Sequence, residues 1–396
     1  MAKTGLAAVM PGIGKEFELR EYPVVDAWPG SIRIKIEVAN VCGSDIHTWQ
    51  GDNAAGRVNS PWPVIPGHEM MGTVDQLGEG VTTDTNGEAL KVGDRVVYGY
   101  TFPCRSCAYC LTGHTTWCTN KRPHTTRSAD TSPHFQGAFA QYYFLYPNHF
   151  VYKCPDEIPD ATAATLNCAM SQVIYALEEA RLGLGDTVVV QGAGGLGLFA
   201  TAIARERGAK KIIVIDGVPE RLELAESFGA HELIDLRELP ESEQRIKRVW
   251  ELTGGIGAEI ACDFVGFPAV MLEGLQMLGN GGRYLEVGNI NTGLTCEFEP
   301  NLLVRRHLQI IGMLQYEPRH LKQAVDFVQA TLGKYPYQKL MAYEFPLTEI
   351  NRAFKEQVTG RIPRAALRAW QEAPPPTPSI RPTMGPHIPT ALRWRG

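Results

Sequence analysis

A glycine-rich turn between an apolar strand and a helix most constrains how this chain can fold. Residues 188–190 are three valines, the pattern G-x-G-x-x-G follows at 192–197, and a helical pattern continues to about residue 206. In this context the first glycine makes a tight turn, the second lets the backbone approach a pyrophosphate, and the third allows close helix–strand packing. We therefore predict a dinucleotide-binding turn. It comprises Gly192, Gly194, Gly195, Leu196 and Gly197.

Strands and helices alternate around this turn. Four further apolar runs are typical of buried strands and are separated by helical stretches, at residues 212–215, 260–265, 284–288 and 308–312. A chain that alternates in this way builds a parallel, doubly wound sheet with helices on both faces. We expect this α/β dinucleotide-binding domain to span residues 166–313.

The first 165 residues have a different pattern. Residues 32–38 alternate apolar and polar side chains with a period of two, as in a half-buried strand, and Gly and Pro punctuate the region. We expect a mostly-β domain over residues 1–165, rejoined by residues 314–368. Residues 369–396 are rich in proline, so we expect an extended or disordered tail there, with a docking arm on a neighbouring subunit as the alternative.

The overall charge narrows the class of partner. The formal net charge is −5, which argues against nucleic acid or an anionic membrane surface as the main partner. No apolar run approaches the ~18 residues of a membrane span, and the apolar stretch near the N-terminus is too short for a signal peptide. We expect a cytoplasmic protein that acts on a small molecule.

A cluster of cysteines is the second strong feature. The chain has nine cysteines, an odd number that does not suggest a disulfide framework. Four of them lie on one short loop, namely Cys104, Cys107, Cys110 and Cys118. Four soft ligands suit a closed tetrahedral zinc site with no position left for substrate, so we expect a structural role. An iron–sulfur cluster is the alternative, but its usual spacings differ from these.

A carboxylate follows the glycine turn at the expected distance. Asp216 ends the next strand, 19 residues beyond Gly197. A carboxylate there hydrogen-bonds the ribose hydroxyls of a dinucleotide and repels a 2′-phosphate, so we expect NAD rather than NADP. Arg221 lies about one helical turn further on, where it either flanks the adenine or tolerates a 2′-phosphate.

Together these motifs resemble the zinc-containing medium-chain alcohol dehydrogenases, over about residues 5–368. The resemblance depends on C-G-S-D-x-H at 42–47, G-H-E-x-x-G at 67–72, the four-cysteine loop, G-A-F-A-Q-Y at 137–142 and the glycine turn. It implies a GroES-like catalytic domain with an inserted Rossmann domain, and two zinc ions per chain. It also implies a catalytic zinc held by Cys42, His68 and Cys168, a ligand set already known for alcohol dehydrogenase. Taken singly, each of these three residues is more often a core residue than a ligand.

The resemblance assigns roles to the neighbours of these ligands. Glu69 is expected close behind the metal as a transient ligand, and Asp45 is expected to support His68. Zinc lowers the pKa of a bound hydroxyl, so an alcohol can lose its proton and transfer hydride to the nicotinamide. Ser44 would accept the proton, and the imidazole of His47 would pass it on.

Further expectations concern the cofactor and the assembly. Val265 and the pair Val287-Gly288 follow strands of the α/β domain and are expected to line the ribose and nicotinamide. Arg364 is expected to pair with the pyrophosphate, with a plain solvent-facing arginine as the alternative. Dimers and tetramers both occur with this architecture, and we expect a homodimer or a homotetramer.

The substrate is less constrained than the reaction. Large apolar residues favour a medium-sized, secondary or cyclic alcohol over a polyol; they are Ile46, Trp49, Trp62, Phe102 and Phe139. Two alternatives keep the same fold. One is a zinc-free enoyl or quinone reductase that uses NADPH, which the Cys/His/Cys set argues against. The other is a non-enzymatic structural protein. This alternative would be excluded if the protein transferred hydride and the Cys42→Ala variant did not.

Overall fold

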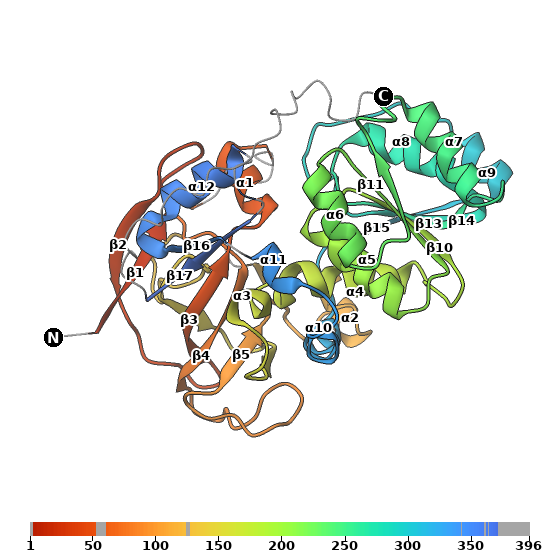
Figure 1. The fold of residues 1–396 in the computed structure, drawn as a ribbon. Helices are drawn as coiled ribbons and strands as arrows, with labels where there is room; N and C mark the ends of the chain where they lie inside the picture. The colour runs from red at the N-terminus through yellow and green to blue at the C-terminus, as the bar shows by residue number, and fades with distance from the viewer. Residues whose placement is uncertain are drawn as a thin grey trace. The chain divides into compact units, whose positions relative to one another are not determined.

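The computed structural model describes residues 3–52, 61–123, 127–341, 343–359, 362 and 364–370. These residues divide into two units, one running to Ser171 and resuming at Tyr316, the other spanning Gln172–Gln315 (Figure 1). From residue 371 onward the predicted tail lies outside the described residues. Within the described ranges, no helix is both long and apolar enough to span a bilayer.

The second unit is a six-stranded parallel sheet. Its strands are β10 (Thr187–Gln191), β11 (Lys211–Asp216), β12 (Glu232–Asp235), β13 (Ala258–Asp263), β14 (Leu278–Glu286) and β15 (Gln309–Gly312). Its helices are α4 (Ser171–Glu179), α5 (Gly195–Glu206), α6 (Pro219–Ser227), α7 (Ser242–Leu252), α8 (Pro268–Met277) and α9 (Asn301–Arg306). The strand order is β12-β11-β10-β13-β14-β15.

This order confirms the predicted doubly wound sheet. All five strand pairs are parallel, and the order reverses between β10 and β13. Figure 1 shows α5 and α6 on one face of the sheet and α7 and α8 on the other. Such helices cover the central strands on both sides, so every residue of β10 is buried. Ligands of doubly wound sheets bind beyond the carboxyl ends of the strands at the point of reversal.

The first unit is mostly β. Its strands are β1 (Thr4–Val9), β2 (Glu18–Pro23), β3 (Ile32–Asn40), β4 (Glu69–Leu77), β5 (Arg95–Tyr98), β6 (Thr101–Phe102), β7 (Arg122–Pro123), β8 (Tyr142–Leu145), β9 (Val151–Lys153), β16 (Tyr343–Pro346) and β17 (Ala365–Arg368). Its helical segments are α1 (Gly43–Gln50), α2 (Ala108–Leu111), η2 (Thr115–Trp117), α3 (Asp160–Ala163), η3 (Leu166–Met170), α10 (Pro318–Thr331), α11 (Tyr337–Leu340), η4 (Leu347–Glu349) and α12 (Ile350–Val358).

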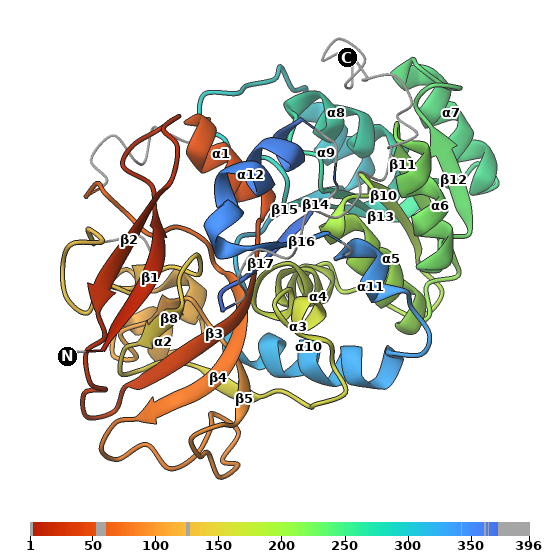
Figure 2. The same cartoon turned by 60° about the vertical axis from the view of Figure 1, so that its left-hand side comes forward.

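Segments from both parts of the chain build the main sheet of this unit. Strands follow one another in the order β16-β17-β3-β4-β5-β9, and β8 also pairs with β3. The late strand β17 pairs with the early strand β3, with Ala366 opposite Asn40. In both ribbon views α12 lies beside α1 (Figures 1 and 2).

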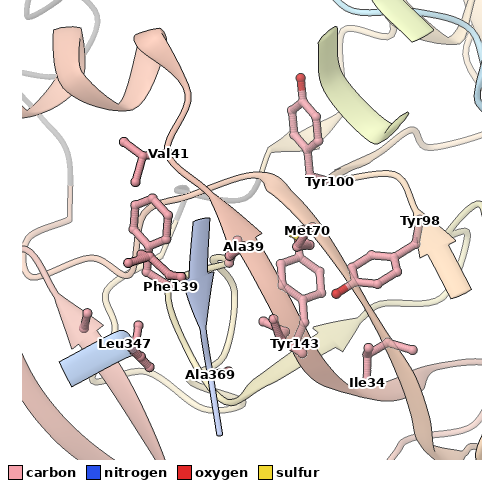
Figure 3. Close-up of a cluster of buried hydrophobic side chains, with 14 of the residues drawn as sticks. Ile34, Ala39, Val41, Met70, Tyr98, Tyr100, Phe139, Tyr143, Leu347 and Ala369 are labelled. Atoms are coloured by element: carbon pink, nitrogen blue, oxygen red, sulfur yellow. The ribbon is translucent and has the colours of Figure 1, made fainter. Parts of the chain in front are cut away.

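A continuous core stabilises the first unit. It includes Ile34, Met70, Tyr98, Tyr143 and Leu347, all fully or almost fully buried (Figure 3). The rings of Tyr98 and Tyr143 lie 5.3 Å apart in a tilted arrangement. Large aromatic side chains bury much apolar area, so this core contributes strongly to the stability of the first unit.

The chain between Asp160 and Glu179 forms three consecutive helical segments. α3 and α4 flank η3, which is a single turn of π-helix centred on Cys168. Hydroxyl groups bond back to the main chain at both ends, Thr165 to the oxygen of Thr162 and Ser171 to that of Leu166. Single π-turns of this kind are frequent at functional sites, because the wider turn redirects a side chain.

Candidate functional site

Four buried side chains from three segments of the first unit converge. Cys42 precedes α1, His68 and Glu69 lie at the start of β4, and Cys168 lies in η3. One ligand atom from each lies within 4.8 Å of all the others. The structure thus brings together the three predicted metal ligands and Glu69. We call these four residues the catalytic cluster.

Asp45 orients two members of the catalytic cluster. Its Oδ1 lies 3.2 Å from Nδ1 of His68, and its Oδ2 accepts a hydrogen bond of 3.0 Å from the main-chain N–H of Cys42. Nε2 of His68 remains on the other side of the ring, 3.4 Å from Oγ of Ser44. A carboxylate behind a metal-binding imidazole fixes the ring and its tautomer. This matches the supporting role predicted for Asp45.

The two thiols of the cluster ionise unequally, because their shared hydrogen bond and burial raise the pKa of Cys168 well above its usual value. Burial lowers the pKa of His68, but the charge and hydrogen bond of Asp45 outweigh burial and raise it well above its usual value. A hydrogen bond from Cys168, together with His68 nearby, holds the pKa of the Cys42 thiol well below its usual value despite burial. The thiolate is the form that binds metal, and binding to His68 must release its proton.

Glu69 and Arg364 form a buried ion pair. Nη2 of Arg364 donates to Oε1 of Glu69 at 2.9 Å, and the two residues are 8% and 0% exposed. Burial raises the pKa of Glu69 to about 8, although Arg364 opposes this shift. Oε2 of Glu69 is buried and has no hydrogen-bond partner among the described residues. A buried acceptor without a partner, beside two thiols and an imidazole, suits a cation.

This geometry changes the interpretation of Arg364. The side chain is buried, so the alternative of a plain solvent-facing arginine is wrong. Its Nη2 is bound to Glu69 and its Nη1 has no partner among the described residues, so the predicted contact with a pyrophosphate stays a prediction.

The predicted proton-transfer residues lie on α1. Ser44 reaches the catalytic cluster through His68. His47, three residues later, is 39% exposed, and its Nδ1 lies 2.9 Å from Oδ2 of Asp52. Helix α1 therefore carries one hydroxyl at the cluster and, about one turn later, one imidazole at the surface.

The four-cysteine loop, residues 104–118, forms the second cluster. The four Sγ atoms of its cysteines lie within 4.8 Å of one another, and none of these cysteines forms a disulfide. Main-chain N–H groups point at sulfur, from Cys107 to Cys104 and from Cys104 to Cys118, each at 3.3 Å. Hydrogen bonds from Ser106 lower the pKa of Cys104 to about 5. Four converging thiols with such donors suit a closed tetrahedral metal site.

The glycine turn in the second unit has the geometry that the motif requires. Gly192 has φ of +95°, and a Cβ there would lie 2.8 Å from the side chain of Val265. A Cβ at Gly197 would lie 1.8 Å from the carbonyl oxygen of Gly192, so only glycine allows this approach. α5 begins after Gly194 without a capping side chain. Its first N–H groups therefore suit a phosphate.

Asp216 holds this turn in place. Its Oδ2 accepts the N–H of Ala193 at 2.7 Å, and its Oδ1 accepts the N–H of Val218 at 2.9 Å. Arg221 lies 3.8 Å away on the same carboxylate. Asp216 therefore shapes the turn. It also lies where a carboxylate that binds the ribose hydroxyls is expected.

A second carboxylate organises the next two strand ends and was not predicted. Oδ1 of Asp263 accepts the N–H groups of Val265 and Gly266, at 2.6 and 3.2 Å, and its Oδ2 accepts Nδ2 of Asn289 at 3.0 Å. Burial and the nearby charge of Glu286 raise the pKa of Asp263 to about 8. An acidic residue at the carboxyl end of a buried strand is the signal that could have revealed it.

The same carboxylate brings the predicted cofactor-lining segments together. Val265 follows β13, and Val287-Gly288 follows β14. A Cβ at Gly266 would lie 2.5 Å from the main-chain oxygen of Gly288, so the two strand ends are in close contact.

Two of the apolar residues predicted to line a substrate pocket, Phe102 and Phe139, belong to the buried core of the first unit, whereas Ile46, Trp49 and Trp62 are only partly buried and pack against that core. Phe139 lies in the core of the first unit, edge-on to Phe17 and Phe354 (Figure 3). Tyr100, which was not predicted, lies against the catalytic cluster, with its ring centroid 4.9 Å from that of His68.

Comparison with known proteins covers most of the chain. Residues 28–156 match the model of the alcohol dehydrogenase GroES-like domain, and residues 195–330 match the model of the zinc-binding dehydrogenase. A 5-exo-hydroxycamphor dehydrogenase of Pseudomonas putida is 34% identical over 355 residues, which cover 87% of this chain and 93% of that protein. An erythritol/L-threitol dehydrogenase of Mycolicibacterium smegmatis is 30% identical over 354 residues, covering 87% and 92%.

A solved structure agrees with the fold. An alcohol dehydrogenase of Thermotoga maritima superimposes with a TM-score of 0.86 at 30% identity, and the match covers 92% of this chain and 99% of that one. The similarity therefore extends through both units and is not limited to one motif. The chain belongs to the zinc-containing medium-chain alcohol dehydrogenase family and is an oxidoreductase of that family.

Proposed function

We propose that this protein is a zinc-dependent dehydrogenase that oxidises a secondary, preferably cyclic, alcohol to a ketone with NAD as hydride acceptor. The observation that carries the proposal is the catalytic cluster. Two thiols and an imidazole converge there in a buried site, beside a carboxylate oxygen of Glu69 that has no partner among the described residues. Three such ligands with one open position are typical of a catalytic zinc.

The protein groups of the cluster have separate tasks. When bound, zinc would supply Lewis acidity that lowers the pKa of an alcohol hydroxyl. Cys42, Cys168 and Nε2 of His68 would hold the metal, while Asp45 keeps the imidazole in its orientation. Oγ of Ser44 lies beside Nε2 of His68 and would accept the hydroxyl proton.

His47 would pass this proton to solvent. His47→Gln should lower kcat at neutral pH by up to about 100-fold, the lower end of the usual range for a positioned proton-transfer group. It should also weaken the pH dependence of kcat, because glutamine does not titrate. The pH profile and the solvent deuterium isotope effect measure this.

His134→Gln is the matched control for His47→Gln. His134 stacks on Tyr22 with ring centroids 5.0 Å apart and is outside the catalytic cluster. A His47→Gln enzyme with the pH profile of the wild type would remove His47 from the mechanism.

Asp216 supports the preference for NAD. Asp216→Asn should reduce kcat/KM for NAD by about 10- to 100-fold, the equivalent of one lost hydrogen bond to a charged group, and should reduce it less for NADP. Asp235→Asn is the matched control, since Asp235 stands opposite Asp216 at the end of β12 and pairs with Arg237. Steady-state kinetics with both cofactors measure the effect. An unchanged NAD/NADP ratio in Asp216→Asn would contradict this role.

The names of two relatives suggest the substrate class. The hydroxycamphor dehydrogenase acts, by its name, on a cyclic secondary alcohol, and the erythritol/L-threitol dehydrogenase acts on polyols. We favour the cyclic class, because the first relative is more similar to this chain and because apolar residues were predicted around the site. A panel of primary, cyclic secondary and polyol substrates tests this. A clear polyol preference would overturn the cyclic assignment while leaving the dehydrogenase assignment intact.

Metal content separates the proposal from its alternatives. We expect two zinc ions per chain, and loss of activity on removal of the metal from the catalytic cluster. A zinc-free enzyme active with NADPH on enones or quinones would support the reductase alternative. If the fully zinc-loaded protein oxidised none of the alcohols tested, a structural role would be supported. We also expect a homodimer or a homotetramer, which light scattering would establish.

A further inference from the structure

Glu317 is a buried carboxylate that binds the end of the four-cysteine loop. Its Oε2 accepts hydrogen bonds from N and Oγ1 of Thr115, at 2.9 and 2.5 Å. Its Oε1 accepts hydrogen bonds from N and Oγ1 of Thr116, at 3.0 and 2.7 Å. The two threonines belong to η2, which ends directly before Cys118. Four charge-assisted hydrogen bonds therefore fix this end of the loop to the residue that precedes α10.

The preceding residue, Tyr316, holds the segment that carries Cys168. The Tyr316 hydroxyl donates to the main-chain oxygen of Asn167, the neighbour of Cys168 in η3. The charge of Cys168 is among the causes that raise the pKa of Tyr316, after burial. α10 also packs against η3. Tyr316 thus holds the π-turn that presents one of the metal ligands.

Asn167 extends this contact to the other ligands. Its buried side chain donates to the main-chain oxygen of Tyr98 at 3.0 Å and accepts the N–H of Met70 at 3.4 Å. Met70 directly follows Glu69 on β4, so the amide of Asn167 holds η3 against the strand that carries His68 and Glu69. The spacing of the cluster therefore depends on how η3 is held.

We propose that Tyr316 and Glu317 are positioning residues that make metal retention by the catalytic cluster depend on the folded state of the four-cysteine loop. This inference rests on the proposed function, because it requires zinc at both clusters. If the loop opens, Glu317 loses four donors at once. Only the capping contact with the first turn of α10 then remains. A buried carboxylate that has lost most of its hydrogen bonds is costly, so the chain around residue 317 relaxes and Tyr316 moves with it. The π-turn then holds Cys168 less firmly.

Zinc release from the intact, zinc-loaded protein to a chromogenic chelator tests the link without reference to activity. The wild type should release metal in two phases. Cys104→Ser removes the phase that belongs to the four-cysteine loop, and Cys42→Ser removes the phase that belongs to the catalytic cluster. Glu317→Gln should accelerate both phases by about 10- to 100-fold, the usual effect of losing a residue that orients a metal ligand. Tyr316→Phe should accelerate only the phase of the catalytic cluster.

Tyr337→Phe is the matched control. The Tyr337 hydroxyl bonds to Oγ1 of Thr331 at 2.8 Å, at the opposite end of α10 from Glu317, and Tyr337 belongs to neither cluster. This variant also removes a buried tyrosine hydroxyl next to α10, so a general loosening of the helix would appear in it. Both release phases should keep their wild-type rates.

A double-mutant comparison tests the coupling itself. Made alone, Cys104→Ser should accelerate zinc release from the catalytic cluster. Made together with Glu317→Gln, it should add little, because the link between the loop and Glu317 is already broken. Additive effects, or wild-type release rates in Glu317→Gln and Tyr316→Phe, would overturn the inference. Wild-type protein that binds fewer than two zinc ions would instead contradict the proposed function. If Glu317→Gln does not fold, Thr116→Val removes one of the four bonds and should shift both phases in the same direction by less.

Discussion

Cys42→Ser should lower kcat/KM for alcohol oxidation by at least about 10³-fold. In the proposed site Cys42 would supply one of two thiolate ligands, and serine binds zinc far less well. Lewis acidity at the reacting oxygen contributes several kcal/mol to the transition state, and each 1.4 kcal/mol corresponds to a factor of ten. Steady-state kinetics, zinc content and the thermal unfolding midpoint of the same preparation measure this effect.

The fold should survive this substitution. Cys42 precedes α1, whose first turn remains held by Asp45. Cys154→Ser is the matched control, since Cys154 is also a buried thiol of the first unit but belongs to neither cluster. It should retain both zinc ions and nearly full activity. If Cys42→Ser retained wild-type kcat/KM, the catalytic cluster would not be the site of the reaction.

Arg245→Met should lower the free energy of unfolding of the second unit by about 3–5 kcal/mol, the usual cost of removing one partner from a buried ion pair. Arg245 is 1% exposed and bridges α7 to α8. Its Nε and Nη2 donate to the two carboxylate oxygens of Glu273, at 2.8 and 2.7 Å. Its Nη1 donates to the main-chain oxygens of Leu239 and Pro240, at 2.9 and 2.6 Å. Denaturant unfolding followed by far-UV circular dichroism measures the loss.

This loss should grow as the pH rises. Burial already raises the pKa of Glu273, while Arg245 lowers it, so the substitution raises the pKa of Glu273 further. The carboxyl group then binds its proton more tightly in the folded protein than in the unfolded chain. Folded stability accordingly falls as the pH rises from the pKa of the unfolded chain toward that of the folded protein. Arg245→Met should therefore be less stable at pH 8 than at pH 5, relative to the wild type at each pH.

Two further variants separate the buried ion pair from charge in general. Arg248→Met removes a half-exposed arginine of the same helix, which lies 3.6 Å from Glu251, and should cost less than about 1 kcal/mol. The double variant Arg245→Met/Glu273→Leu leaves no unpaired charge and should recover much of the loss. If Arg245→Met unfolded like the wild type, the ion pair would contribute nothing to stability.

Features that depend on neighbours in the sequence were predictable. The glycine turn carries its own context, a buried strand before it and a helix after it, so both the turn and the doubly wound sheet could be predicted. The four-cysteine loop is equally local, because its four thiols lie within residues 104–118. In both cases the spacing along the chain itself limits the geometry.

Features that depend on distant contacts were not predictable from spacing. Cys42, His68 and Cys168 could be grouped only through resemblance to a family, because nothing in their spacing brings three separate segments together. Glu317 was missed because its partners, Thr115 and Thr116, lie about 200 residues earlier in the chain. Contacts of this kind exist only after the first unit has folded, so no local pattern indicates them.

The pairing of β17 with β3 affects how the protein can be made on the ribosome. Gln172–Gln315 form a complete sheet from one continuous stretch, so this unit can fold while the remainder is still being synthesised. The sheet of the first unit stays open at β3 until Ala365–Arg368 leave the exit tunnel. The cysteines at 42, 104–118 and 168 are therefore synthesised long before their surroundings close. During translation the thiols of both clusters are therefore accessible to oxidation and to other metal ions until the C-terminal strand has paired.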